Sequence, residues 1–176
     1  MSLSSSLARV SSRVLTAGKA LRPFSSETVV SLAVRGKGEG VSMKIDTGCG
    51  AHSFPADALP SFGGADSAPS PLYYVLSGIA SCNQITGSLV AKDLGVKVGV
   101  WEVEVNAELD VAVLATGSEG NANFHEIHGK IRVQTDADSA QLAKLRSETE
   151  RRCPVTQLYQ RSGLKYDIEW EAAPLP

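Results

Sequence analysis

The sequence predicts an α+β fold organised around one long helix. Stretches of helical periodicity and stretches of alternating apolar and polar residues follow one another in the order β-β-α-β-β-α-α-β. No internal repeat and no regular βαβ alternation accompany them, which favours α+β over α/β. With 176 residues, the chain is long enough to form one domain with a substantial core.

Two strands are expected ahead of the long helix. Residues 28–35 are rich in β-branched side chains, residues 36–40 form a glycine-rich turn, and residues 41–46 return as the second strand of a hairpin. Residues 47–71 contain four glycines and four prolines, so we expect a loop there.

The long helix is predicted to begin near Pro71, which suits a first helical turn, and to stop at Gly95. Its only charges, Lys92 and Asp93, lie near its end, so we expect a helix buried on most sides but too polar to span a bilayer. The apolar face recurs at steps of three and four residues: Leu72, Val75, Leu76, Ile79, Cys82, Thr86, Leu89 and Val90. Small residues beside this face predict the close approach of another helix: Gly78, Ala80, Ser81, Gly87 and Ser88.

Two more strands are predicted after this helix. Residues 97–110 alternate apolar and polar side chains, as a half-buried strand does. Residues 124–135 place Ile127 and Ile131 on one face, and residues 111–123 between the two strands are expected to be a loop.

The last third of the chain predicts two helices and a strand. Asp138 caps a helix that runs through Arg152, and a second short helix opens at Cys153-Pro154 and ends before Gly163. Residues 164–171 alternate again and form the final strand.

The amino-terminal segment differs in composition from the rest. Residues 1–25 hold four basic residues, many serines and no acid, which is typical of an organellar transit peptide, with residues 26–176 as the folded domain. Arg22-Pro23-Phe24-Ser25 is similar to a mitochondrial cleavage site, so we expect a mitochondrial protein, with the plastid as the alternative; a disordered basic tail remains open. The net charge of −2 is too small to indicate a nucleic-acid partner.

The three cysteines are an odd number and lie far apart, at Cys49, Cys82 and Cys153. This spacing argues against a secreted disulfide framework and leaves catalysis, metal binding or inert burial. Cys153 stands at a predicted helix start, where exposed N–H groups lower the pKa of a thiol. Cys82 lies inside an apolar helix and needs a nearby donor or cation in order to ionise.

Four short motifs, in this order, resemble the signature of the OsmC/Ohr family (osmotically inducible protein C and organic hydroperoxide resistance protein). They are Gly63-Gly64-Ala65-Asp66, Pro69-Ser70-Pro71, Ile79-Ala80-Ser81-Cys82 and Arg152-Cys153-Pro154-Val155. The resemblance extends over essentially the whole chain from residue 28.

The resemblance implies an OsmC-like intertwined homodimer, in which two copies of the long buried helix pack centrally and antiparallel sheets from both subunits wrap them. It also implies thiol peroxidase activity on small-molecule organic hydroperoxides. In that chemistry the Cys82 thiolate attacks the O–O bond and becomes a sulfenic acid, Cys153 resolves it to a disulfide, and an external dithiol reduces the disulfide. No metal, bound cofactor, nucleic acid or membrane is expected.

The family's chemistry uses an Arg to hold the thiolate and a Glu to anchor that Arg. The resemblance makes Arg35 the candidate for the former, but the Glu is absent, because Leu72, Tyr73 and Tyr74 stand where it is normally found. Tyr73 and Tyr74 are candidates for donating a hydrogen bond to the substrate, and His52 is a candidate for lining the approach to the site.

One alternative within the family is a protein without peroxidase activity. Such a protein uses the same interface pocket to bind a small apolar ligand or to carry a thiol modification. The missing Glu and the glycine-rich loop favour this reading, whereas the retained pair of Cys82 and Cys153 favours the peroxidase.

Other motifs carry less weight. Asp46-Thr47-Gly48 is similar to the active-site loop of retropepsin-type aspartic proteases, in which paired aspartates share a proton, but the tripeptide also forms an ordinary turn. His125 and His128 fall on opposite faces of a strand, and Cys49 with His52 lacks a second ligand pair, so no metal site is predicted.

Overall fold

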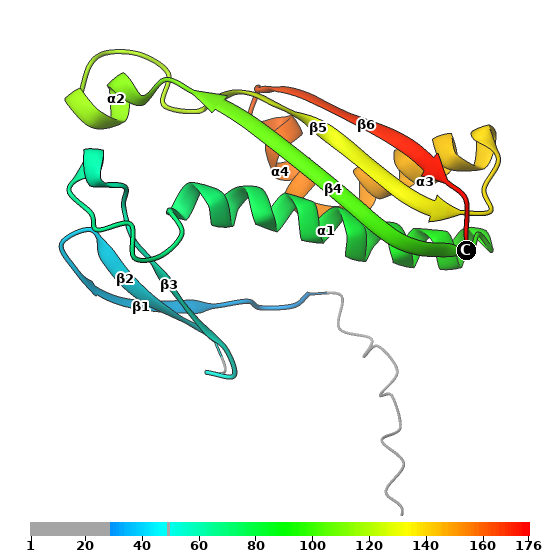
Figure 1. Ribbon diagram of the computed structural model, residues 1–176, viewed down its shortest axis with the longest axis horizontal. Helices are drawn as coiled ribbons and strands as arrows, with labels where there is room; N and C mark the ends of the chain where they lie inside the picture. Colours follow the sequence, from blue (N-terminus) through cyan, green and yellow to red (C-terminus); the bar gives the residue numbers. More distant parts are fainter. Residues whose placement is uncertain (1–28, 49) are drawn as a thin grey trace, which may run out of the picture. The chain divides into compact units, whose positions relative to one another are not determined.

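A computed structural model of the chain describes residues 29–48 and 50–176. The predicted transit peptide, residues 1–25, and Cys49 lie outside the described residues. The α+β class is confirmed: two three-stranded sheets accompany a long helix α1 (Pro71–Leu94) in the unit formed by residues 34–176 (Figure 1).

The first sheet is antiparallel and consists of β1 (Val34–Glu39), β2 (Ser42–Thr47) and β3 (Ser53–Ala56). The expected strand at residues 28–35 is misplaced, since β1 begins at Val34 and runs through the segment predicted as a turn. Gly36 belongs to the strand because it pairs with Ile45 of β2, and a Cβ at Gly36 would lie 2.4 Å from the Met43 Sδ atom. Strand β3 and the 3-10 helix η1 (Pro60–Phe62) fall within the predicted loop.

The second sheet has the order β4-β5-β6, with β4 at Val98–Leu109, β5 at Phe124–Thr135 and β6 at Lys165–Ala173. Strands β4 and β5 are antiparallel, as expected, whereas β5 and β6 are parallel, so this sheet is mixed. The cause is the crossover between β5 and β6, which returns the chain to the same end of the sheet before the last strand begins. Helix α2 (Val111–Thr116), capped by Asp110, occupies part of the expected loop between β4 and β5.

Helices α1, α3 (Ser139–Arg152) and α4 (Pro154–Arg161) cover one face of the second sheet (Figure 1). Their predicted starts are confirmed at Ser70, which accepts from the Leu72 N–H, and at Asp138, which forms a capping box with Gln141. Trp101 and Trp170 pack edge to face, with ring centroids 5.7 Å apart. The two core clusters join the inner face of the sheet to the helices: Ile79, Ile127, Ile131, Tyr159 and Ile168 in one, and Val90, Ala91, Val96 and Leu145 in the other.

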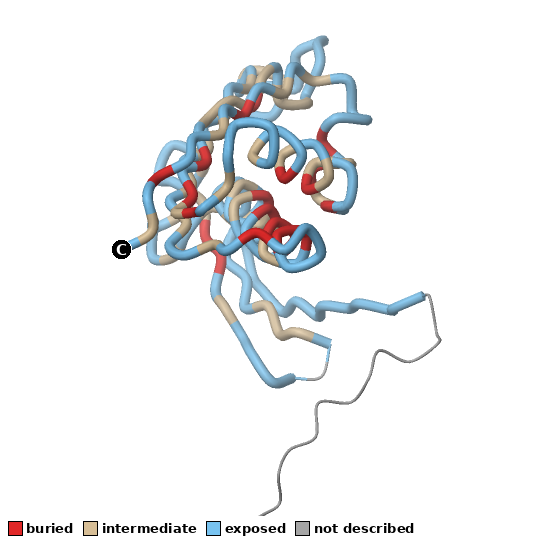
Figure 2. Tube along the Cα trace, turned by 90° about the vertical axis from the view of Figure 1, so that its right-hand side faces the viewer, coloured by how far each residue is buried: buried red, intermediate tan, exposed pale blue. Residues whose placement is uncertain are grey.

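Within this chain, helix α1 buries only one side (Figure 2). The residues on that side are Ile79, Asn83, Thr86, Gly87, Val90 and Ala91. Three members of the predicted apolar face, Leu72, Val75 and Leu89, are instead exposed, because the sheet and helices α3 and α4 reach only the other side. Among the described helices, none combines the length and hydropathy that crossing a membrane requires.

Gly87 lets α1 approach the sheet and not another helix. A Cβ at this position would lie 2.6 Å from the Cη2 atom of Trp101, a rigid ring held in the core. The small residue is therefore needed for the contact between α1 and β4.

Asp57 organises the loop that leads into α1. This carboxylate is 3% exposed and accepts hydrogen bonds from the backbone N–H of Ala58 (2.8 Å), Ala65 (3.2 Å) and Ser67 (3.0 Å) and from the Ser67 hydroxyl (2.8 Å). The Ser67 bonds are the main cause of a lowered pKa for Asp57. The charged form of Asp57 thus ties together both ends of the Gly63-Gly64 loop.

We predict that Gly87→Ala destabilises the protein although alanine is the better helix former. Overpacking against Trp101 should cost about 1–3 kcal/mol of unfolding free energy, measured by denaturant titration. The control Gln84→Ala, on the exposed side of α1, should change this free energy by less than about 0.5 kcal/mol. Equal stability of Gly87→Ala and wild type would contradict the tight contact.

We also predict that Asp57→Asn lowers the midpoint of thermal unfolding at pH 7 and makes this midpoint depend less on pH between 3 and 7. Because folding lowers the pKa of Asp57, its contribution is present above the pKa of the unfolded chain and is lost as the pH falls through the folded value. The matched control is Asp66→Asn, an exposed neighbour with the same change of charge. The same thermal midpoint for both variants across pH 3–7 would contradict this role of Asp57.

Candidate functional site

Cys153 sits at the junction between α3 and α4. Pro154 disfavours helical backbone at the residue before it, so Cys153 adopts an extended conformation (φ −74°, ψ 113°) and becomes the N-cap of α4. Its sulfur accepts the Thr156 N–H at 3.5 Å, as a serine or aspartate oxygen does at other helix starts. The whole residue is 0% exposed.

Cys82, on helix α1, lies next to Cys153. Its thiol is partly buried and donates a hydrogen bond to the Cys153 sulfur. The structure therefore brings together the two sulfurs that the sequence singled out, across 71 residues of chain, and leaves both as free thiols.

The two thiols differ in acidity. Burial raises the pKa of Cys153, but hydrogen bonds from the Thr156 hydroxyl and N–H, from Cys82 and from the Val155 N–H outweigh it, so this pKa lies below its ordinary value. For Cys82 the balance is opposite: burial and the neighbouring Cys153 raise its pKa. The hydrogen-bond donors around Cys153 therefore favour the charged form of its sulfur.

A buried polar pair stands behind Cys153. The Asn83 Nδ2 atom donates to the Ile79 carbonyl (2.9 Å) and to the Thr156 Oγ1 atom (3.1 Å), and both Asn83 and Thr156 are at most 2% exposed. The Tyr166 hydroxyl lies beside this pair, and burial raises its pKa, which keeps it protonated. The sequence signal for Asn83 was its place four residues after Ile79, on the face that proves to be buried.

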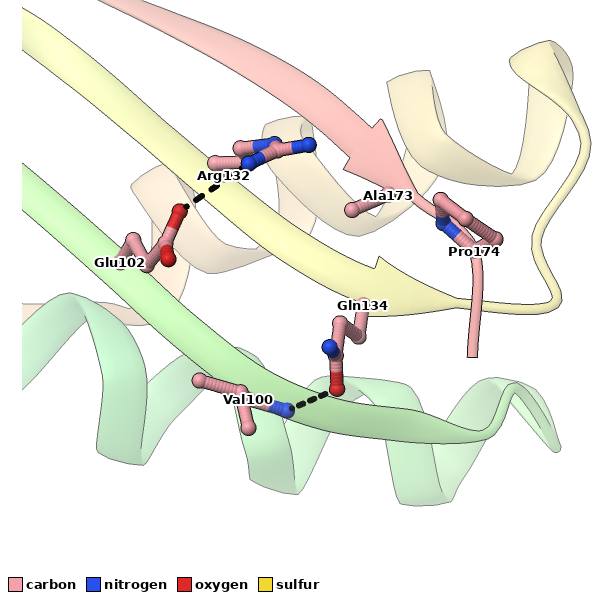
Figure 3. Close-up of a pocket in the computed structure, with 6 residues that line it drawn as sticks. All are labelled: Val100, Glu102, Arg132, Gln134, Ala173 and Pro174. Carbon is pink, nitrogen blue, oxygen red and sulfur yellow. Dashed lines mark hydrogen bonds and ion pairs between the residues drawn. The ribbon is translucent and has the colours of Figure 1, made fainter. Parts of the chain in front are cut away.

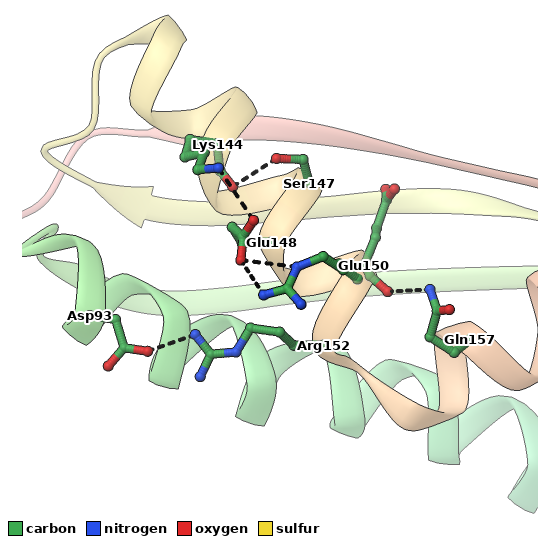
Figure 4. Close-up of polar contacts among 8 residues, drawn as sticks. Asp93, Lys144, Ser147, Glu148, Glu150, Arg152 and Gln157 are labelled. Atoms are coloured by element: carbon green, nitrogen blue, oxygen red, sulfur yellow. Dashed lines mark hydrogen bonds and ion pairs between the residues drawn. The ribbon is translucent and has the colours of Figure 1, made fainter.

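Polar contacts fix the helices that carry the two cysteines (Figure 4). Arg152, next to Cys153, places its Nη1 atom 2.6 Å from the Asp93 Oδ2 atom and so joins α3 to α1. The Gln157 Nε2 atom donates to the Glu150 carbonyl at 3.0 Å and joins α4 back to α3. These contacts hold the turn at Cys153 against α1.

The other predicted site residues lie elsewhere. Arg35 is exposed on β1 opposite Asp46, and within the described residues no ion pair or hydrogen bond links it to Cys82 or Cys153. His52 is exposed, and its backbone N–H donates to the Thr47 Oγ1 atom at 3.3 Å.

The two tyrosine candidates lie near the start of α1. Tyr73 is 60% exposed. Tyr74 donates its hydroxyl to the Pro55 carbonyl and packs its ring 4.9 Å from that of Phe54, so it joins α1 to β3. Both precede Cys82 by more than two helical turns, roughly 12 Å along the axis.

The weaker motifs have structural roles. Asp46 lies in β2 with its Oδ1 atom 3.7 Å from the Lys44 Nζ atom, and the chain turns at Gly48. His128 lies 3.9 Å from Glu126 on β5. In the described part of the chain no three His, Cys, Asp or Glu side chains gather as metal ligands do.

Two cavities lie away from the cysteines. A small one of about 150 Å³ lies along β4 and β5 near the end of β6 and is lined by Glu102, Arg132 and Gln134, among others (Figure 3). A larger, mainly apolar one of about 640 Å³ lies at the start of α1, between Leu59, Phe62, Leu72 and Leu114.

The sequence of this chain matches the sequence model of one known protein family. Residues 64–169 match the sequence model of the family described as OsmC-like protein. A search of curated protein sequences finds no significant match.

Solved structures share the fold at low sequence identity. An OsmC-like protein from Mycoplasma pneumoniae has a TM-score of 0.70 and 18% identity, with 82% of this chain and 98% of that one covered. An organic hydroperoxide resistance protein from Elizabethkingia anophelis has a TM-score of 0.66 and 17% identity, with 84% and 99% covered. One from Legionella pneumophila has a TM-score of 0.63 and 13% identity, with 82% and 99% covered.

Proposed function

The chain belongs to the OsmC-like protein family, and on that premise we propose that it is a thiol peroxidase that reduces organic hydroperoxides. The observation that carries the proposal is the contact between Cys82 and Cys153, two free thiols held together by a buried helix junction. Two fold neighbours are organic hydroperoxide resistance proteins, which agrees with this chemistry.

The difference in accessibility supports different roles for the two sulfurs. Cys82 keeps some exposed surface whereas Cys153 has none, so peroxide meets Cys82. The Cys82 thiolate attacks one peroxide oxygen, the O–O bond breaks, and the alcohol leaves after taking up a proton. Cys153 then attacks the Cys82 sulfenic acid, hydroxide leaves as water, and a disulfide forms. An external dithiol returns both residues to thiols.

The uncovered surfaces support a homodimer. On α1 an exposed apolar stripe, which includes Val75 (42%), Ile85 (62%) and Leu89 (51%), faces away from its own sheet. The first sheet is exposed along most of its length, and a three-stranded sheet needs a covered face to be stable. A second copy of the chain would cover the apolar stripe and the first sheet. In such a dimer Arg35 remains the candidate for the cation that holds the Cys82 thiolate.

We also propose that the protein is mitochondrial, because residues 1–25 have the composition of a transit peptide.

A second candidate function is the binding of a small apolar ligand without peroxide reduction. The cavity of about 640 Å³ at the start of α1 and the raised pKa of Cys82 favour it, because a protonated thiol attacks peroxide slowly.

The peroxidase proposal predicts a defined loss of thiols. With stoichiometric cumene hydroperoxide, the reduced protein should lose two thiols within minutes and form a Cys82–Cys153 disulfide, measured by peptide mass. Cys153→Ser should stop at oxidised Cys82, Cys82→Ser should keep its Cys153 thiol, and Cys49→Ser should behave like wild type. Wild-type thiols that survive this treatment would contradict the peroxidase and favour the ligand-binding candidate.

The dimer proposal predicts that Ile85→Glu halves the mass in solution. A charge in the centre of the exposed apolar stripe would be buried without a partner on association. Light scattering coupled to size exclusion should give twice the chain mass for wild type and for the control Gln84→Glu, on another side of α1. A monomeric wild type, or an unchanged Ile85→Glu, would contradict an interface on this stripe.

A further inference from the structure

The buried polar pair behind Cys153 has a specific hydrogen-bond polarity. Asn83 donates from Nδ2 to the Thr156 oxygen at 3.1 Å, and the same Nδ2 atom is held by the Ile79 carbonyl at 2.9 Å. A threonine hydroxyl has one proton to give. The Asn83 Oδ1 atom also lies within reach of this proton, but at 3.4 Å it is the longer of the two contacts, so the shorter one has the Thr156 oxygen accepting from Nδ2. In that arrangement the Thr156 proton can turn to the Cys153 sulfur, which also receives the Thr156 N–H at 3.5 Å.

The surroundings of Cys153 contain two further groups that can lose a proton, and few charges. Cys82 faces it from α1 and Tyr166 faces it from β6. On α3 the Glu150 carboxylate is paired with Arg146 at 2.8 Å, and Arg152 is paired with Asp93. Among the described residues, the donors to the Cys153 sulfur are therefore the neutral groups of Thr156, Cys82 and Val155.

Cys153 is closed to solvent whatever covers α1, whereas Cys82 keeps some exposed surface in the single chain. Cys153 is 0% exposed within its own subunit, so a second copy can only add to its burial. A thiol that comes from outside the protein can therefore reach only the Cys82 sulfur.

We propose that Thr156, oriented by Asn83, holds the Cys153 sulfur as a thiolate, so that the external dithiol attacks Cys82 and Cys153 is the leaving group. This inference rests on the proposed function and adds the direction of the reducing step. Thr156 and Asn83 act through Cys153 and are positioning residues.

The step balances in atoms and electrons. One thiolate of the dithiol attacks the Cys82 sulfur, a mixed disulfide forms, the Cys82–Cys153 bond breaks, and its electron pair stays on Cys153. The second thiol of the dithiol then attacks the mixed disulfide, forms the cyclic disulfide of the reductant and releases Cys82, which takes up a proton. A sulfur that is stabilised as a thiolate leaves faster, which is what the buried donors provide.

A titration of thiolate absorbance at 240 nm tests the assignment without peroxide. In a Cys49→Ser background, a step below the ordinary thiol value of about 8.5 should disappear in Cys153→Ser and remain in Cys82→Ser. Thr156→Val should move its midpoint up by about one pH unit, and Thr156→Ser should restore it. If Thr156→Val fails to fold, Thr156→Ala replaces it.

A matched control separates the hydroxyl's role from general packing. Thr149 on α3 is also 0% exposed, and its hydroxyl has no hydrogen-bond partner among the described residues. Thr149→Val therefore makes the same chemical change in the core and should leave the titration midpoint where it is. A midpoint that Thr156→Val does not shift, or that Thr149→Val shifts equally, would overturn the positioning role.

Mapping the mixed disulfide tests the direction of attack. The Cys82–Cys153 disulfide is formed with diamide, treated briefly with glutathione, quenched in acid and digested for mass analysis. Glutathione should be found on Cys82, and reduction of Thr156→Val by dithiothreitol should be several-fold slower than that of Thr149→Val. Glutathione on Cys153, or a low titration step that belongs to Cys82, would overturn the proposal. Because neither assay uses peroxide, a failure of the peroxidase proposal would be seen separately.

Discussion

The break between α3 and α4 is the constraint on which the site depends. Pro154 cannot continue α3, so Cys153 turns into extended backbone and presents its sulfur to the first N–H groups of α4. The same turn is held against α1 by the ion pair between Arg152 and Asp93, and Cys82, about three helical turns before Asp93, meets Cys153. Without the break, Cys153 would be one more residue on the face of a continuous helix.

The fold then assigns different environments to two chemically identical groups. Cys153 is fully enclosed, and its hydrogen-bond donors outweigh the effect of burial on its pKa. Cys82 keeps some exposure, and its donors, the Val155 N–H and the Thr86 hydroxyl, do not outweigh burial and the neighbouring Cys153. Burial alone would raise the pKa of both thiols; the donors decide which of them ionises first. This difference suits a pair in which the Cys82 sulfur reacts with molecules from solution and the buried Cys153 sulfur reacts with Cys82.

Much of the fold could be predicted because its signals are local. Pro71, Gly95 and Asp138 mark helix ends through backbone chemistry that needs no tertiary context. The direction of β6 could not be predicted, since pairing between distant strands depends on the path of α3 and α4. Gly36 and Gly87 were misread because their contacts, with Met43 and Trp101, are made across the structure.

The residues of the site likewise fall into those that local sequence signals predict and those that they do not. The two cysteines could be found from their motifs, and the acidity of a thiol at a helix start follows from local geometry. The buried pair of Asn83 and Thr156 could not be predicted from the sequence, because the pair depends on which side of α1 faces α4. Leu72, Val75 and Leu89 showed helical periodicity, but periodicity does not tell whether the same subunit or a second copy covers that face.

The most direct test of the account is a crystal structure of the reduced protein that measures the separation of Cys82 and Cys153. We predict sulfurs in hydrogen-bond contact and Cα atoms within about 7 Å, the limit for joining two cysteines without backbone movement. Cα atoms clearly farther apart than this, with the two sulfurs facing different surroundings, would contradict the two-thiol site.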